Sequence, residues 1–154
     1  MGTALRAALW LVVGGWVGSF GLFALVVART AFEVLPSTEI AGQLVGPVLE
    51  TLHLYGAAAG LGAFGLALAL GRGRLLQLLP LALAAACLYS QFGVSAEIAE
   101  IRPFISGPEG NAEAAARFTE LHRRSIAIFG AVWTGAILLV VLHARDDARA
   151  ARSD

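Results

Sequence analysis

The sequence contains no lysine, so all eleven of its basic residues are arginines, and it has one cysteine and one methionine. The cysteine, Cys87, cannot form a disulfide within the chain, and its position inside an apolar run predicts a buried, unreactive thiol. Charged residues make up 14% of the chain, whereas a typical soluble domain has roughly 25%. Because the formal net charge is +0, the overall charge does not attract nucleic acid, and no nucleic-acid partner is expected.

Apolar residues are correspondingly abundant. Hydrophobic residues make up 58% of the 154 positions, and the mean hydropathy is +0.75. A chain this short has a large surface for its volume, so it cannot turn all of these side chains inward. A lipid bilayer is the solvent that accommodates the excess. We therefore expect the chain to reside in the cell membrane, with the lipid bilayer as its principal partner.

Four long runs of the sequence are free of acidic and basic residues. Each approaches the ~20 residues that a helix needs to cross ~30 Å of hydrocarbon. The runs are continuous rather than alternating, which excludes a transmembrane β-barrel. The expected fold class is all-α, an integral membrane four-helix transmembrane bundle in a single domain of residues 1–145. The expected spans cover about residues 7–29, 47–71, 75–98 and 123–144.

The connections between the first three spans carry recognisable turn and capping residues. Residues 71–74, with the sequence Gly-Arg-Gly-Arg, predict a tight hairpin that makes the second and third spans antiparallel neighbours. Ser37 or Thr38 is expected to cap a short helix that runs to Gly46. Pro47 then suits the first turn of the second span.

The fourth span is expected to begin outside the membrane. Asn111 is a good N-cap, which predicts an outer helical extension over about residues 111–123. Within it, Glu113 and Arg117 are four residues apart, the spacing of a helical ion pair. At the other end of the chain, residues 146–154 are expected to form a polar cytoplasmic tail.

The arginines predict the orientation of the bundle. One side of the membrane receives Arg6, Arg72, Arg74, Arg145, Arg149 and Arg152. The other side receives Arg29, Arg102, Arg117, Arg123 and Arg124. The second group is mixed with most of the glutamates and lies partly in one long loop, so we place both termini in the cytoplasm. The first apolar run is too long for a signal peptide and lacks a clear small-x-small cleavage site, which predicts a retained helix.

Glycine is frequent in the first two spans. Gly14, Gly18 and Gly21 share one stripe of the first helix, and Gly56 and Gly60 form a small-x-x-x-small pair on the second. Such residues allow helix backbones to approach closely. These stripes predict either packing inside the bundle or a contact between two copies of the chain in a homo-oligomer.

Polar residues gather at the predicted outer end of the bundle, and Glu50-x-x-His53 is the best single signal among them. A spacing of three places carboxylate and imidazole on one helix face, where they could share a divalent metal ion. Di-metal four-helix bundles use two Glu-x-x-His motifs, whereas this sequence has one, because Thr119 rather than glutamate precedes His122 by three residues. The candidate metal ligands are Glu50, His53, Glu97, Glu100 and His122.

A haem is the second cofactor hypothesis. His53 and His122 are predicted at similar depth on different helices, as the two axial ligands of a b-type haem would be. The third hypothesis is that the two histidines form hydrogen bonds within the protein and bind no cofactor. Since the sequence has no Gly-rich phosphate loop, no cysteine pair and no basic cluster with interleaved aromatics, enzymatic activity is left open and a non-enzymatic role is preferred.

Short motifs spread over nearly the whole chain resemble a known family. They are the glycine-rich first helix, Phe32 with Leu35-Pro36, Ile101-Arg102, and residues 121–125 with the sequence Leu-His-Arg-Arg-Ser. These motifs resemble small four-helix membrane proteins of the transmembrane protein 205 type, and more distantly copper-resistance membrane proteins of the CopD kind. The resemblance implies a four-helix membrane fold without an established activity, and it points toward metal handling. The sequence nevertheless lacks the methionine and cysteine clusters that soft metals prefer.

Three functional hypotheses follow from these observations. The leading one is a non-enzymatic multi-pass membrane protein whose outer Glu/His cluster binds a cation or a partner. The second is a small metal- or haem-binding membrane oxidoreductase. The third is an accessory or scaffold subunit of a larger membrane complex, for which a membrane protein partner is expected.

Overall fold

The computed structural model describes residues 2–105 and 111–153, and nearly all of them are helical. The first long helical segment consists of α1 (Gly2–Leu22), the π-helical η1 (Phe23–Ala28) and α2 (Arg29–Val34). The second is α3 (Thr38–Ala69). The third consists of α4 (Arg74–Tyr89), the π-helical η2 (Ser90–Ser95), α5 (Ala96–Ile101) and the 3₁₀-helical η3 (Arg102–Phe104), and the fourth is α6 (Ala112–Ser153). Each segment is long and apolar enough to cross a bilayer, so the prediction of four such helices is confirmed.

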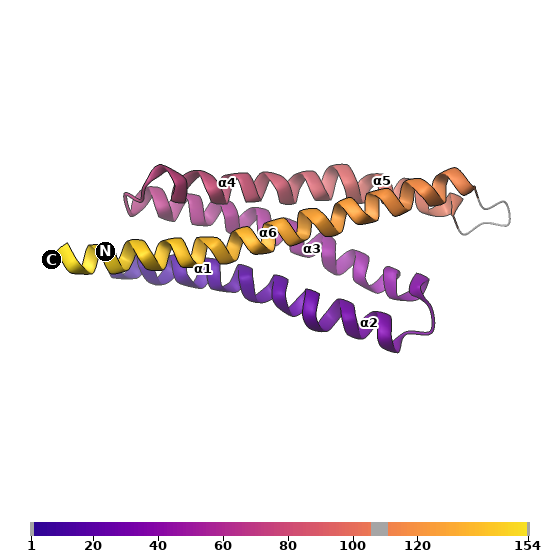
Figure 1. Cartoon of the computed structure of the whole chain (residues 1–154), viewed down its shortest axis with the longest axis horizontal. Coiled ribbons are helices and arrows are strands. Elements are labelled where there is room, and N and C mark those ends of the chain that lie inside the picture. Colours follow the sequence, from indigo (N-terminus) through magenta and orange to yellow (C-terminus); the bar gives the residue numbers. More distant parts are fainter. Residues whose placement is uncertain (1, 106–110, 154) are drawn as a thin grey trace.

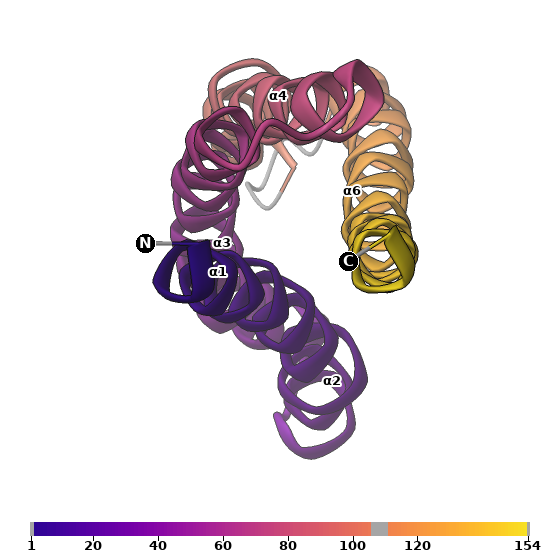
Figure 2. The same ribbon diagram turned by 90° about the vertical axis from the view of Figure 1, so that its left-hand side faces the viewer.

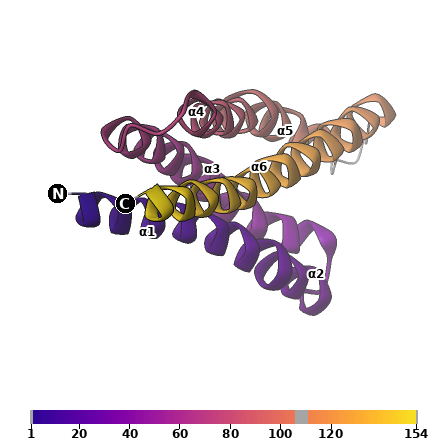
Figure 3. The same cartoon turned by 60° about the vertical axis from the view of Figure 1, so that its left-hand side comes forward.

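The four segments form an elongated bundle (Figure 1). α3 packs between α1 and α4, and α6 packs between α4 and α1, so α3 and α6 lie diagonally (Figure 2). Both chain termini and the turn between α3 and α4 lie at one end, which we call the termini end (Figure 1). The far end holds α2, the start of α3, α5 and the start of α6. Toward the far end, α2 diverges from α6 (Figure 3).

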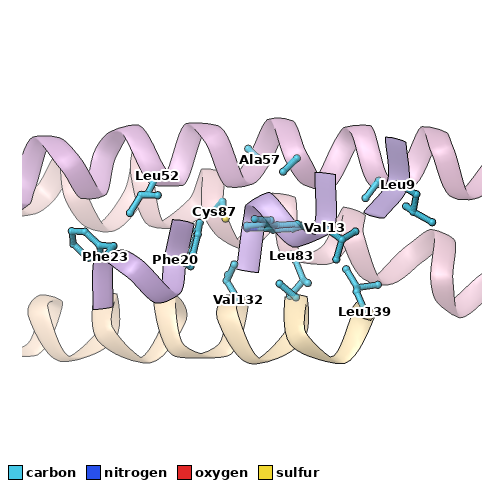
Figure 4. Packing of buried hydrophobic residues seen from close by; sticks show 14 of the residues in the cluster. Leu9, Val13, Phe20, Phe23, Leu52, Ala57, Leu83, Cys87, Val132 and Leu139 are labelled. Atoms are coloured by element: carbon cyan, nitrogen blue, oxygen red, sulfur yellow. The ribbon is translucent and has the colours of Figure 1, made fainter. Parts of the chain in front are cut away.

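A single face of α1 supplies much of the core. Leu9, Val13, Trp16 and Phe20 recur every three or four residues, and each is at most 1% exposed. This spacing places them along one side of a helix. The Phe20 ring stacks on Phe129 of α6, with 4.8 Å between the ring centroids. The core therefore runs along α1 between the other three segments, as the labelled side chains show (Figure 4).

The start of α3 confirms one sequence prediction and corrects another. The Ser37 hydroxyl accepts a hydrogen bond from the Ile40 backbone N–H at 3.2 Å, so Ser37 is the N-cap that was expected. The short helix does not end at Gly46, because Pro47 lies inside one continuous helix from Thr38 to Ala69. A proline inside a helix removes one backbone donor, a loss that long helices in apolar surroundings tolerate.

The predicted hairpin between the second and third segments is confirmed. Gly71 adopts a left-handed conformation with φ +65°. The Gly71 N–H donates to the Leu68 carbonyl at 3.0 Å, and the Arg72 N–H donates to the Ala67 carbonyl at 2.9 Å. This pair of bonds is the Schellman motif, in which glycine avoids the strain that a Cβ would meet at positive φ. α4 then begins at once after Gly73.

The two glycine stripes have different surroundings. A Cβ at Gly56 would lie 2.8 Å from Cys87 Sγ, and a Cβ at Gly60 would lie 2.7 Å from the Pro80 carbonyl oxygen. The prediction of close packing inside the bundle is therefore confirmed for α3. On α1, a Cβ at Gly21 would lie 3.2 Å from the Trp133 ring, so internal packing is confirmed for Gly21. A Cβ at Gly14 or Gly18 would meet nothing within 4 Å among the described residues, so an internal interface does not explain these two glycines.

Candidate functional site

An ion-pair network joins α5 to α6 at the far end. Arg117 Nε lies 2.6 Å from Glu97 Oε1 across the two helices, and Arg117 Nη1 lies 3.3 Å from Glu120 Oε2. Glu120 also pairs with Arg124 at 3.2 Å. Arg117 was expected to pair with Glu113, but in the structure it pairs with Glu97 and Glu120 instead. The reason is that Glu97 approaches from a neighbouring helix and offers Arg117 a second carboxylate. The network fixes the first turns of α6 against α5.

The other far-end residues predicted to hold a metal do not join Glu97. Glu50 and Glu100 are exposed, and their side chains have no hydrogen bond or ion pair with any described residue. His122 is also exposed, and its ring stacks on Phe118 with 5.8 Å between the centroids. In residues 2–105 and 111–153, no three His, Cys, Asp or Glu side chains are grouped so that they could hold a metal ion. The five predicted ligands are thus not brought into one cluster.

The two residues of the Glu50-x-x-His53 motif differ in burial, because the edge of the bundle lies between them. His53 is 1% exposed, whereas Glu50 on the same helix is exposed. A spacing of three residues turns the side chain by about 60° around the helix axis, and here that turn separates a buried position from an open one. The shared helix face therefore does not place both side chains inside the bundle.

His53 contacts a polar group of α4–η2 that sequence analysis missed. Its Nδ1 lies 3.4 Å from Gln91 Oε1, and its Nε2 is buried without a hydrogen-bond partner among the described residues. Ser90, next to Gln91, is fully buried, and its hydroxyl also lacks a hydrogen-bond partner in the part of the chain that the structure describes. Both residues begin the π-helical segment η2, and such segments often occur at functional sites. The sequence holds one signal for this contact, because Gln91 is a polar residue inside a long apolar run that is free of charged residues.

The structure does not support two histidines facing a common haem. His53 lies inside the bundle against Gln91, whereas His122 stands on an exposed surface of α6 against Phe118. Axial haem ligands must approach one plane from its two faces. These two rings have different surroundings, so the geometry that a b-type haem requires is not built from them.

A second polar cluster, at the termini end, was also missed. The Arg72 side chain is 5% exposed, and its two terminal nitrogens bind Asp146 Oδ2 and Asp147 Oδ1 of α6. Trp10 Nε1 donates to Asp147 Oδ2 at 3.2 Å, and Arg6 Nε lies 3.9 Å from Asp147 Oδ1. Arg72 therefore connects the α3–α4 turn to α6, and Asp147 extends the connection to α1.

Burial and charge act in opposite directions on Arg72. Burial lowers the pKa of its guanidinium, but the hydrogen bonds and charges of Asp147 and Asp146 prevail and hold that pKa above its ordinary value. The cluster also bears on residues 146–153, for which a polar cytoplasmic tail stays a prediction. These residues continue α6 as helix, and the ion pairs of Asp146 and Asp147 with Arg72 hold this part of α6 against the α3–α4 turn. Asp154 lies outside the described residues.

His143 lies one helical turn before this cluster and is 1% exposed. Neither of its ring nitrogens has a hydrogen-bond partner among the described residues. The bundle thus buries two histidines, His53 in α3 and His143 in α6, and of these His53 alone has a side-chain hydrogen-bond partner in residues 2–105 and 111–153.

Comparison of the chain with models of known families, with curated proteins and with solved structures finds no match.

Proposed function

We propose that the chain is a multi-pass protein of the cell membrane, with its termini end in the cytoplasm. Four helices with the length and composition of membrane spans support this proposal. So do large side chains that point away from the bundle, including Leu11 at 76% and Leu25 at 64% exposed, because contiguous apolar surface of this kind is costly in water. The termini end carries six of the eleven arginines, the pattern that favours a cytoplasmic location.

The protein then acts by binding a partner at its outer face rather than by catalysing a reaction. The observation that carries this is the far-end extension of α6. It begins at Ala112, 13 residues before the apolar run that starts at Ser125, which corresponds to about 20 Å of helix. The Glu97–Arg117–Glu120 network holds the extension against α5. The result is a rigid platform outside the apolar part of the bundle.

The platform and its surroundings present charged side chains that are not used within the chain. Within the part of the chain that the structure describes, Glu50, Glu100 and His122 are exposed and form no ion pair, and the same holds for Arg102 and Arg123. Exposed charges that lack internal partners are available to a partner surface of complementary charge. Because the carboxylates do not converge with a histidine on one point, a macromolecular partner suits this arrangement better than a single metal ion does. The accessory-subunit hypothesis is therefore the form of the proposal that the geometry supports.

Photo-crosslinking in living cells tests this binding face. A photoreactive amino acid placed at Glu50 or Glu100 is expected to give a discrete heavier adduct on illumination. The same amino acid at Leu25, which is exposed on the apolar surface of η1, is expected to give none. The mass of the adduct distinguishes a second copy of the chain from another protein. If Glu50, Glu100 and Leu25 all remain free of adducts while the protein accumulates normally, the outer face is not a binding surface.

A further inference from the structure

The termini end contains a groove that the functions described above do not use. It lies between the start of α4 and the last turns of α6 and has a volume of about 310 Å³. Arg74, Arg145 and Arg149 line it together with the apolar side chains of Leu75, Leu76 and Leu142. The groove therefore combines a cationic rim with an apolar floor.

The three arginines of this rim are exposed, and none of them forms an ion pair within the described residues. Arg145 and Arg149 are four residues apart, so they project from one face of α6 toward the groove that Arg74 enters from α4. The one carboxylate in the lining belongs to Asp146, and Arg72 already binds it. Among the residues that the structure describes, the groove consequently has a surplus of positive charge, which favours an anionic ligand.

The backbone adds to this preference for an anion. Gly73 is the N-cap of α4 and offers no side chain to the first N–H groups of that helix. The N-terminus of a helix carries partial positive charge and exposed N–H groups, which favour phosphate. Gly73 and Arg74 both line the groove, so the helix terminus and the three guanidinium groups act at the same place.

The position of the groove along the bundle selects the kind of anion. Leu75 begins one apolar run, Leu142 ends another, and Leu75 is 63% exposed. The groove therefore lies where an apolar surface gives way to charged residues, which is the level of lipid headgroups in the proposed membrane. We propose that this groove binds an anionic phospholipid, with its phosphate between Arg74, Arg145 and Arg149 and an acyl chain along the three leucines. This proposal rests on the proposed membrane insertion.

Lipid binding to the full chain in mild detergent, measured by native mass spectrometry, tests the site. The probes are phosphatidylglycerol and phosphatidylcholine with identical acyl chains. The wild-type chain is expected to prefer phosphatidylglycerol. Each arginine near the headgroups accounts for about a fivefold change in affinity, so the triple variant Arg74→Gln/Arg145→Gln/Arg149→Gln is expected to bind phosphatidylglycerol on the order of a hundredfold more weakly. Arg152→Gln, at an exposed arginine of α6 outside the groove, is the matched control and is expected to change affinity less than about twofold.

Two further measurements separate the sources of failure. Excess inorganic phosphate that displaces phosphatidylglycerol completely would show a site for free phosphate and overturn the lipid assignment. Equal binding of the two lipids, or unchanged binding in the triple variant, would overturn it as well. Alkaline extraction of the reconstituted chain from vesicles then separates the two hypotheses. If the chain resists extraction although the lipid assignment has failed, membrane insertion stands and only the lipid site is wrong. If alkaline washing removes the chain from the vesicles, membrane insertion and the lipid site are both wrong.

Discussion

Replacing Arg72 by glutamine is expected to lower the free energy of unfolding by about 3 kcal/mol. The guanidinium is nearly buried and binds Asp146 and Asp147 together, whereas glutamine offers a single uncharged amide to two carboxylates. Removing one partner of a buried ion pair leaves an uncompensated buried charge, which destabilises a protein strongly. The side chains of Asp146 and Asp147 are 38% and 22% exposed, so we place the loss of stability at the lower end of the range for buried pairs. Unfolding of the purified protein in mixed micelles with increasing dodecyl sulfate measures the change.

The control for this prediction is Arg152→Gln, at an exposed position of the same helix. Loss of an exposed surface charge is expected to change stability by less than about 0.5 kcal/mol. Equal unfolding curves for the Arg72 variant, the Arg152 variant and the unmodified protein would mean that the contacts at the termini end do not hold α6 to the α3–α4 turn.

Replacing Gly60 by alanine is expected to destabilise the bundle by about 2 kcal/mol. The added Cβ would lie 2.7 Å from the Pro80 carbonyl oxygen and 2.8 Å from Ala84 Cβ. Neither contact is the mobile end of a long side chain, so relief requires α3 and α4 to move apart. The same titration in mixed micelles gives the change in stability.

Gly65→Ala is the matched substitution on the same helix. Gly65 is exposed, and a Cβ there would meet nothing within 4 Å among the described residues. Since alanine has the higher helix propensity, this variant is expected to be more stable than the wild type by up to about 1 kcal/mol. The two variants should thus shift stability in opposite directions. A shift of the same sign and size for both would show that the close approach of α3 and α4 at Gly60 is absent.

The helical architecture could be predicted because it depends on composition over long windows. Runs such as residues 7–28 are uniformly apolar, and only a helix satisfies every backbone group of such a run internally. The Ser37 cap and the Gly71 turn were predictable for a related reason, since each depends on the chemistry of one or two neighbouring residues. Pro47 was misinterpreted because proline is compatible with both the first turn of a helix and the interior of a long one.

The candidate sites could not be predicted because they depend on which helices meet. Gln91 becomes a partner of His53 only when α4–η2 packs on α3, and the two residues are 38 positions apart. Arg72 and Asp147 are separated by 75 positions, and each taken alone is typical of a loop or a tail. Burial of His53 but not Glu50 likewise depends on where the edge of the bundle falls. Sequence spacing predicts a shared helix face but does not say how far a neighbouring helix covers it.

The most direct test of the account is the sidedness of the two ends of the bundle. Cys87 is fully buried, so the unmodified chain should not react with a membrane-impermeant maleimide, and a single added cysteine reports its own position. In intact cells, Glu113→Cys at the far end is expected to be labelled, and Ala148→Cys at the termini end is expected to be labelled only after permeabilisation. Equal labelling of the two positions in intact cells, whether full or absent, would contradict a bundle that crosses the membrane with both termini in the cytoplasm.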